Sequence, residues 1–345
     1  GAEANEGAIK LAYKFHGGKR KYILHSDISF HGKLLGTGSI SSSPEVKFKF
    51  PGLSCTDEFK WNNIEDLKNV IKKYEKNNND PNIFAIIIEP FSASSLLECS
   101  EDFLRELREI CTKKKIILIF DEVYTGWGKT GEFFYFMKYN NLIPDILTMS
   151  KSFGGGKSSI SCFTTTNQIF SKAYGKIQDS TIHSTTYNAF GEEAVTALEA
   201  VNIAVEERYP EKAKEIGNLI KTNLNNLKNK YPNQIKEIRG TGCLQGIIFH
   251  SGPDIIKKII SLIPSELTND ERFVNKLITS SIISTLYSEF KILASLGQNR
   301  DICLWISPPI IVNKQEVEYF FSSLDKTLSY GIIKLITKFI KNKLI

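Results

Sequence analysis

The sequence IILIFDE at residues 116–122 decides the fold class of this chain. A short continuous apolar run that ends in acidic residues is typical of a parallel strand buried on both faces. Two further runs also end in an ionisable residue: residues 83–88 lead into Glu89, and residues 145–150 lead into Lys151. Segments of helical period separate the runs, and this alternation predicts an α/β domain with a parallel sheet.

The strand ends of this predicted sheet carry ionisable side chains. Because ligands in open α/β sheets bind outside the carboxyl ends of the strands, we expect Glu89, Asp121 and Lys151 to share one edge. A single charge at such a position is commonly a solvated loop residue. Two acids and a lysine in succession indicate a functional site.

A lysine beside a carboxylate suits Schiff-base chemistry, because burial and neighbouring charges tune the lysine amine. Pyridoxal phosphate uses such a lysine together with an acid that pairs with its ring nitrogen. Two segments could supply phosphate donors: the helix-forming start at residues 1–12 and the hydroxyl cluster at 184–186. The competing motif GGGKS at residues 154–158 would need glycine at position 151 to form a nucleotide-binding loop, and that residue is Lys151.

Composition excludes several classes of protein. The 345 residues carry a net charge of +6, but basic and acidic residues are interspersed, so we expect no nucleic-acid partner. The six cysteines lie far apart and no histidine has metal-ligand spacing, so we expect reduced thiols and no metal site. With no signal-like segment and no apolar run of bilayer length, we expect a cytoplasmic protein.

The composition also predicts two domains. We expect a large cofactor-binding domain at residues 1–206 and a smaller C-terminal α+β domain at 207–345. The second domain ends in a basic amphipathic stretch at 332–345. Such a stretch can bind a membrane interface, but we expect it to pack on its own domain or on a partner.

The segment FDEVYTGWGKTG at 120–131, followed by PDILTMSK at 144–151, resembles the signature of class III pyridoxal-phosphate aminotransferases of the ornithine and acetylornithine type. The similarity extends over the chain to these motifs: GAEANE at 1–6, FHGK at 30–33, IEP at 88–90, HSTTY at 183–187 and PP at 308–309. The resemblance implies the fold type I architecture, with a mostly parallel sheet in the large domain, and a homodimer. Family members begin with a further N-terminal segment, so we expect this chain to be incomplete at its front.

Residue by residue, the resemblance implies specific roles in holding pyridoxal 5'-phosphate. Lys151 would form the Schiff base and later move the proton, and Asp121 would hold the ring nitrogen protonated. Phe30 and Val123 would pack on the two ring faces.

The phosphate and substrate sides are assigned in the same way. Backbone groups of Gly1 and Ala2 would hold the phosphate, and Thr186 would reach it from the partner subunit. Glu89 would face the substrate. Tyr124 stands where several members have glutamine, and its phenol could replace that donor near the ring hydroxyl.

The predicted activity is transfer of an amino group from an amine or amino acid to an oxo-acid. The same residues would also serve an aminomutase, a racemase or a decarboxylase, and a noncatalytic interaction protein on this fold is a further alternative. Trp305 stands where members that act on amino acids usually carry arginine. This change removes a usual carboxylate partner and favours a cationic or ring-like amine, unless Arg300 supplies the charge.

Overall fold

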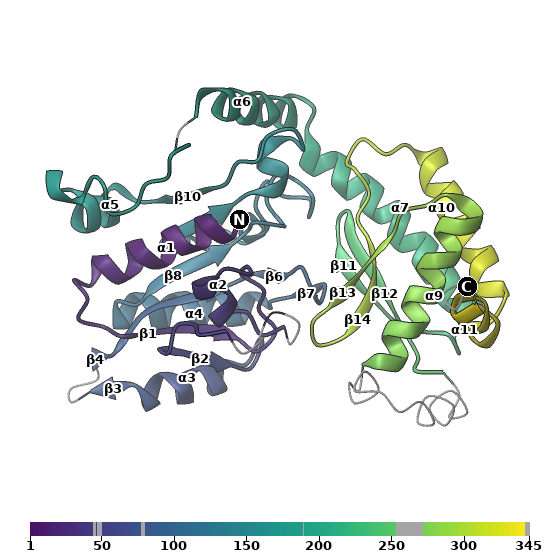
Figure 1. The fold of residues 1–345 in the computed structure, drawn as a ribbon, viewed down its shortest axis with the longest axis horizontal. Helices are drawn as coiled ribbons and strands as arrows, with labels where there is room; N and C mark the ends of the chain where they lie inside the picture. The colour runs from purple at the N-terminus through teal and green to yellow at the C-terminus, as the bar shows by residue number, and fades with distance from the viewer. Residues whose placement is uncertain (44–45, 47–49, 77–79, 189, 253–271, 342–345) are drawn as a thin grey trace. The chain divides into compact units, whose positions relative to one another are not determined.

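A computed structural model describes residues 1–43, 46, 50–76, 80–188, 190–252 and 272–341. They form two compact units, Gly1–Pro210 and Glu211–Ile345, which are described separately (Figure 1). The division of the chain into domains at residues 206 and 207 stays a prediction.

The first unit is built on a six-stranded sheet of order β10-β9-β8-β5-β1-β2. All neighbouring pairs are parallel except β10 with β9. This arrangement confirms the predicted mostly parallel sheet. The strands are β1 (Tyr22–Ser26), β2 (Thr56–Phe59), β5 (Ile83–Ile88), β8 (Ile117–Asp121), β9 (Ile146–Met149) and β10 (Cys162–Thr165).

Helices cover both faces of this sheet. Alternate residues of β5 face opposite sides: Ile86 and Ile88 pack in one apolar cluster with α3 (Ile64–Lys73) and α4 (Glu101–Lys114). Ala85 and Ile87 pack in another cluster with α1 (Ala2–Phe15) and α5 (Asn167–Tyr174). Burial on both faces explains why the central strands read as continuous apolar runs.

The remaining elements of the first unit are short, apart from α6. They are α2 (Leu35–Ser39), β3 (Glu75–Lys76), β4 (Asp80–Pro81), β6 (Phe91–Ser92), β7 (Leu97–Glu98), the 3₁₀ helices η1 (Tyr135–Lys138), η2 (Lys151–Gly154) and η3 (Ile177–Asp179), and α6 (Gly191–Glu206). Helix α7 (Tyr209–Lys230) begins in the first unit and continues into the second.

The second unit contains a smaller antiparallel sheet of order β11-β12-β14-β13. Its core joins this sheet to α7 and to the helices that follow it. Its described elements are β11 (Ile235–Thr241), β12 (Leu244–Phe249), α9 (Phe273–Phe290), β13 (Ser295–Gln298), β14 (Ile302–Ile306), α10 (Lys314–Ser329) and α11 (Ile332–Lys341). The predicted α+β character of the C-terminal part is therefore observed.

The basic C-terminal stretch forms α11, which packs on its own unit. Ile332, Leu335 and Ile336 lie in the core of that unit, and Lys338 forms an ion pair with Glu289. The apolar face of the helix is thus largely used for packing. Residues 342–345 of the predicted tail lie outside the described residues.

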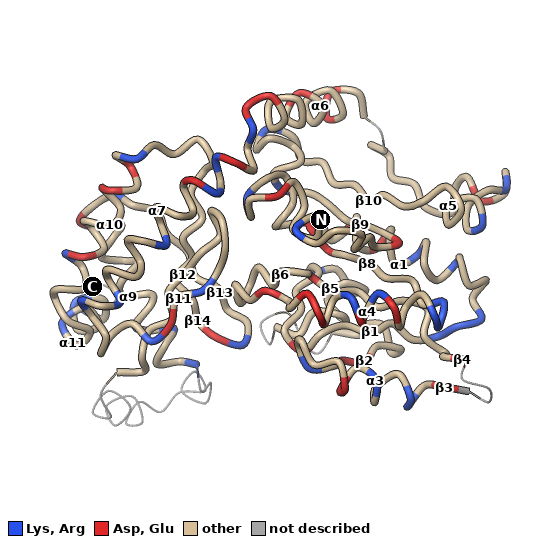
Figure 2. Tube along the Cα trace, turned by 180° about the vertical axis from the view of Figure 1, so that it is seen from behind, with Lys and Arg blue, Asp and Glu red and all other residues tan. Residues whose placement is uncertain are grey.

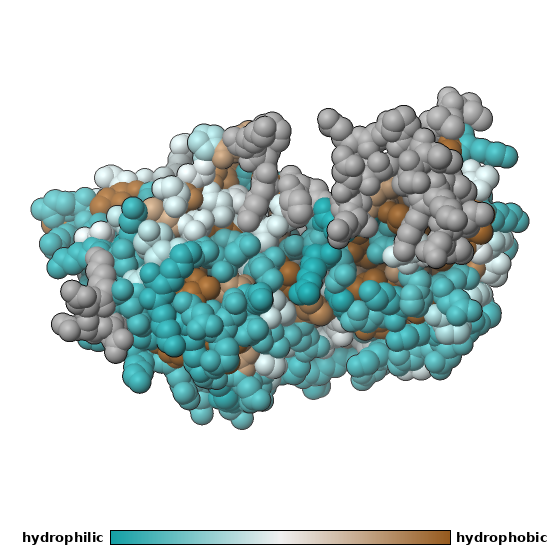
Figure 3. All heavy atoms as spheres, turned by 90° about the horizontal axis from the view of Figure 1, so that it is seen from below, coloured by the Kyte–Doolittle hydropathy of each residue, from teal (hydrophilic) through white to brown (hydrophobic). Residues whose placement is uncertain are grey.

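Charged residues of both signs are mixed over the structure, as they are along the sequence (Figure 2). Figure 2 shows basic and acidic residues interspersed along the chain, and the face in Figure 3 is mostly hydrophilic with scattered apolar patches. Among the described residues, none of the helices is both long and apolar enough to cross a membrane.

Candidate functional site

The carboxyl edge of the main sheet brings together the three ionisable residues that follow the apolar runs. Asp121 ends β8 and pairs in register with Thr148 of β9, two residues before β9 gives way to Ser150 and Lys151. Glu89 follows β5, the other neighbour of β8. The charges of Asp121 and Glu89 both act on the Lys151 amine. The predicted shared edge is present.

Asp121 is a buried carboxylate with three hydrogen-bond donors and is only 5% exposed. Its Oδ2 accepts from Nδ2 of Asn5 at 2.7 Å and from Nδ1 of His31 at 2.8 Å, and its Oδ1 accepts from the backbone N–H of Val123 at 3.0 Å. Burial raises the pKa of Asp121, but these donors and the His31 charge outweigh burial and hold the pKa below its usual value. The carboxyl group is therefore ionised at neutral pH.

The Lys151 side chain is accessible from solvent, while the protein partly desolvates its amine. Its side chain reaches solvent, while its Nζ lies 4.5 Å from the centre of the Tyr124 ring. The protein atoms around the amine lower its pKa through desolvation, and the carboxylates of Asp121 and Glu89 oppose that change. A lysine amine that is reachable and has a lowered pKa is suited to nucleophilic attack on a carbonyl.

The N-terminus of α1 packs against the same edge. A Cβ atom at Gly1 would lie 2.6 Å from Cγ1 of Val123, and one at Gly32 would lie 2.5 Å from Cβ of Ala2. Gly32 also has a φ of +136°, which favours glycine. These close approaches place the positive end of the helix beside Asp121, where an anion is stabilised.

Glu89 binds backbone groups. Its Oε2 accepts from the N–H of Phe30 at 3.0 Å, and its Oε1 accepts from the N–H of Ala93 at 3.2 Å. Burial raises the pKa of Glu89 to about 7. The carboxyl group therefore holds the Phe30 loop and the turn between β6 and β7 in place, and its predicted role toward the substrate stays a prediction.

The structure does not connect Thr186 to this edge within one chain. Thr186 is exposed, and its side chain makes no hydrogen bond within the described residues. Its predicted contribution from a partner subunit stays a prediction.

Asn5 is a partner of Asp121 that sequence reasoning missed, and His31 was noted only as part of the motif at residues 30–33. Asn5 lies on the buried face of α1 with Ala8 and Ala12, and its Nδ2 also donates to the backbone oxygen of His31 at 2.8 Å. A polar residue at helical spacing from buried alanines is the signal that could have identified it.

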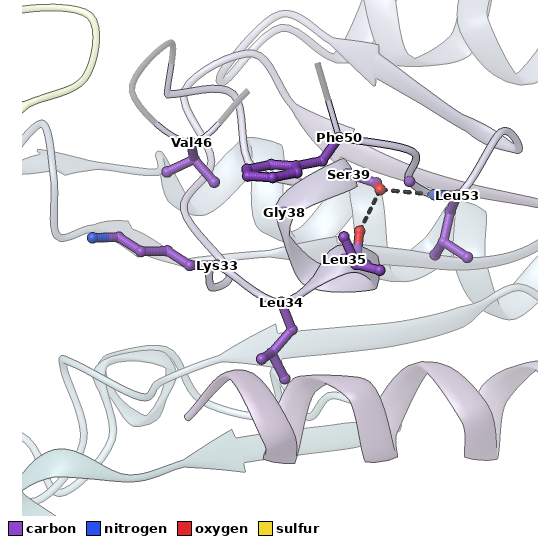
Figure 4. Close-up of a pocket in the computed structure, with 9 residues that line it drawn as sticks. Lys33, Leu34, Leu35, Gly38, Ser39, Val46, Phe50 and Leu53 are labelled. Carbon is purple, nitrogen blue, oxygen red and sulfur yellow. Dashed lines mark hydrogen bonds between the residues drawn. The ribbon is translucent and has the colours of Figure 1, made fainter. Parts of the chain in front are cut away.

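A separate surface cavity of about 300 Å³ lies beside α2 (Figure 4). Ser39 lies in its lining, where its Oγ donates to the backbone oxygen of Leu35 at 2.6 Å and accepts from the N–H of Leu53 at 2.8 Å. The lining includes Lys33, Leu34 and Phe50, but none of the predicted site residues.

Glu122 stabilises the segment that follows Asp121. The Glu122 carboxyl group is fully buried and accepts from the hydroxyl of Thr125 and from the backbone N–H groups of Tyr135 and Phe136. Burial raises the pKa of Glu122 to about 7, although these donors lower it.

We expect the Glu122 carboxyl group to make folding pH-dependent. Its pKa is about 7 in the folded chain and 4.5 ordinarily, so the folded state binds more protons between these values. The free energy of unfolding should fall as pH rises from 4.5 to 7, with about 3 kcal/mol at most from this group. Glu122→Gln should reduce that fall in urea unfolding between pH 5 and pH 8. The exposed control Glu109→Gln should leave it unchanged; equal pH dependence in wild type and Glu122→Gln would contradict the assignment.

Comparison with known proteins gives a consistent result. The sequence profile of the family described as aminotransferase class-III matches residues 1–328. An uncharacterized aminotransferase of Schizosaccharomyces pombe is 24% identical over 334 residues, which cover 95% of this chain. The chain spans 64% of the length of that curated relative.

Solved structures share the fold. A transaminase from the marine bacterium Virgibacillus aligns with a TM-score of 0.82 and 22% identity, covering 98% of this chain and 74% of that chain. The ornithine aminotransferase of Toxoplasma gondii ME49 aligns with a TM-score of 0.78 and 22% identity, covering 96% and 71%. Another structure of the Toxoplasma gondii enzyme, described with partial occupancy of PLP at its active site, aligns with a TM-score of 0.76 and 22% identity, covering 95% and 70%.

Proposed function

The chain belongs to the class-III aminotransferase family, which depends on pyridoxal 5'-phosphate, and we propose that it transfers an amino group from an amine or amino acid to an oxo-acid. One observation carries the proposal: Asp121, kept ionised by three donors, and Lys151, with a desolvated amine, lie at the carboxyl ends of neighbouring strands at one edge of the sheet.

The residues at this edge fit pyridoxal phosphate. Three polar atoms around Asp121 are buried and have no hydrogen-bond partner within the described chain: Oδ1 of Asn5, Nε2 of His31 and Oγ1 of Thr148. Buried polar atoms ordinarily have a partner, which a polar ligand or ordered water would supply. The helix N-terminus beside them would suit the phosphate group.

Each side chain has a distinct task in this proposal. Pyridoxal phosphate, when bound, supplies a conjugated ring that takes up electrons from the reacting carbon. Lys151 would hold the cofactor covalently and then move a proton at that carbon, while Asp121 would hold a proton at the ring nitrogen. Phe30 and Val123 would pack on the two ring faces and exclude water.

The phosphate would be held at the first turn of α1. Backbone N–H groups of Gly1 and Ala2 would donate there, supported by the helix dipole. The close packing of Gly1 on Val123 and of Ala2 on Gly32 fixes the position of this turn.

We further propose that Thr186 completes the phosphate site of a second copy in a homodimer. The exposed position of Thr186 supports this proposal. Helix α6, which follows it, exposes the apolar side chains of Val195, Leu198 and Val205. Sedimentation should show a dimer, and a monomer for the triple change of these side chains to lysine. A monomeric wild-type chain would contradict this assembly.

The substrate side favours amines over simple α-amino acids. Glu89 would shape this side through the backbone of Phe30 and Ala93. In the sequence, Trp305 stands where family members that act on amino acids usually carry arginine, and tryptophan has no charge for a substrate carboxylate. We therefore expect diamines and ring-like amines to be donors.

A donor panel tests the proposed function. The holoprotein is mixed with amino acids, diamines or simple amines and an oxo-acid, and both the new amino acid and the deaminated donor are quantified. Both products should appear in equal amounts. An aminomutase would yield a rearranged amine and a racemase the enantiomer of the donor, and neither would consume the oxo-acid. A decarboxylase would release carbon dioxide, and a chain that binds the cofactor but changes no donor would refute transamination.

A further inference from the structure

The Tyr124 ring contacts the amine of Lys151. Tyr124 lies three residues after Asp121 and is half-buried, and the Nζ of Lys151 lies 4.5 Å from the centre of its ring. The face of an aromatic ring attracts a cation at this distance. This contact differs from the phenol role that the sequence suggested for Tyr124.

A second aromatic contact joins the same two segments. The Trp127 ring stacks on Phe153, with ring centres 5.3 Å apart and planes at 15°. Trp127 and Lys151 both have left-handed backbone, with φ of +70° and +48°. Such conformations are costly for residues other than glycine and persist where surrounding contacts hold them. The loop after Asp121 therefore holds the turn that carries Lys151 at two points.

We propose that Tyr124 is a positioning residue for Lys151, whose free amine it holds as an ammonium at the sheet edge whenever that amine is not bonded to a cofactor or substrate. The proposal deepens the proposed function and rests on it for its catalytic meaning. The Asp121 and Glu89 carboxylates also attract this ammonium. Unlike these two carboxylates, the Tyr124 ring carries no charge. It attracts the ammonium over its face and so favours one position of the amine.

Amine modification of the cofactor-free protein tests this role. Trinitrobenzenesulfonate labels only the unprotonated amine, so the rate at Lys151, resolved by peptide mass spectrometry across a pH series, gives the pKa of the amine. Tyr124→Leu should lower the midpoint by about 0.5 pH unit, because the ring no longer stabilises the ammonium. Labelling below the midpoint should then be about threefold faster. Tyr124→Phe keeps the ring and should keep the wild-type midpoint.

The experiment distinguishes a positioning role of Tyr124 from simple steric shielding of Lys151. The rate at high pH reports access to the amine, so a change in that rate with an unmoved midpoint would show that Tyr124 only shields Lys151 and would overturn the proposal. An equal shift in Tyr124→Phe would assign the effect to the hydroxyl group and would also overturn it. Lys334, whose Nζ lies 5.3 Å from the Tyr330 ring, is the reference in the same samples and should titrate identically in every variant.

Two further outcomes are distinguished. If Tyr124→Leu does not fold, Tyr124→Gln replaces the ring by a polar side chain and should give the same lower midpoint. An unchanged midpoint in Tyr124→Gln would overturn the proposal. The titration needs no cofactor. A chain that takes up no pyridoxal phosphate but shows the ring-dependent midpoint would therefore refute the proposed function and leave the contact between Tyr124 and Lys151 established.

Discussion

Lys151→Ala is expected to remove both the cofactor absorbance that survives gel filtration and the transamination activity. Alanine can neither bond to the cofactor nor move a proton at the reacting carbon. Loss of a positioned nucleophile and proton carrier should reduce kcat by at least about a thousandfold. Absorbance spectra after gel filtration and product formation with the best donor measure the two effects.

A neighbouring lysine provides the control for this change. Lys157 is exposed in the loop that follows η2, and Lys157→Ala removes the same charge without touching the sheet edge. It should keep absorbance and activity. Because the Lys151 side chain also reaches solvent, Lys151→Ala should melt close to the wild type. Equal absorbance in Lys151→Ala and wild type would show that another group holds the cofactor.

Asp121→Asn is expected to lower kcat about a hundredfold to a thousandfold while much of the cofactor stays bound. A neutral amide cannot keep a proton on the ring nitrogen as an ionised carboxylate does, and a preorganised charge at a reacting centre is commonly worth this much. The amide also replaces an acceptor that now binds Asn5 and His31. Single-turnover rates with a saturating donor separate the chemical step from cofactor binding.

A carboxylate at the other end of β9 is the matched control for this prediction. Asp145 pairs with Arg108 at 3.0 Å and accepts from the N–H of Leu118 at 2.8 Å. Asp145→Asn should lower stability and leave the single-turnover rate of the folded fraction unchanged. Equal rates in Asp121→Asn and wild type would contradict the proposed role of Asp121.

The sheet edge could be predicted because its sequence signal is local. Strands buried on both faces must be apolar throughout, so the change to Glu89, Asp121 or Lys151 marks where each strand meets the ligand side. The family assignment also came from local motifs, and the match over residues 1–328 confirms it.

The surroundings of Asp121 could not be predicted in the same way. Asn5 and His31 are 116 and 90 residues away from Asp121 along the chain, and only the packing of α1 and the Phe30 loop on the sheet brings them together. Sequence spacing carries no information about such contacts. The same holds for Glu89, whose oxygens accept from the backbone N–H groups of Phe30 and Ala93, because sequence patterns do not report backbone partners.

Tyr124 shows a second limit. The motif fixes its position along the chain, but the direction of a side chain depends on the backbone of its loop. That loop contains the left-handed Trp127, and the structure turns the Tyr124 ring toward Lys151. The sequence therefore identified Tyr124 as a site residue but did not predict its contact with Lys151.

Borohydride reduction of the protein loaded with pyridoxal phosphate tests the central claim most directly, because reduction fixes the cofactor on the side chain to which it is bonded. Digestion and mass spectrometry then locate the added mass. We expect one modified peptide, which contains Lys151, and no modification when an amine donor is supplied before reduction. A modification on another lysine, or a chain that retains no cofactor, would contradict the account.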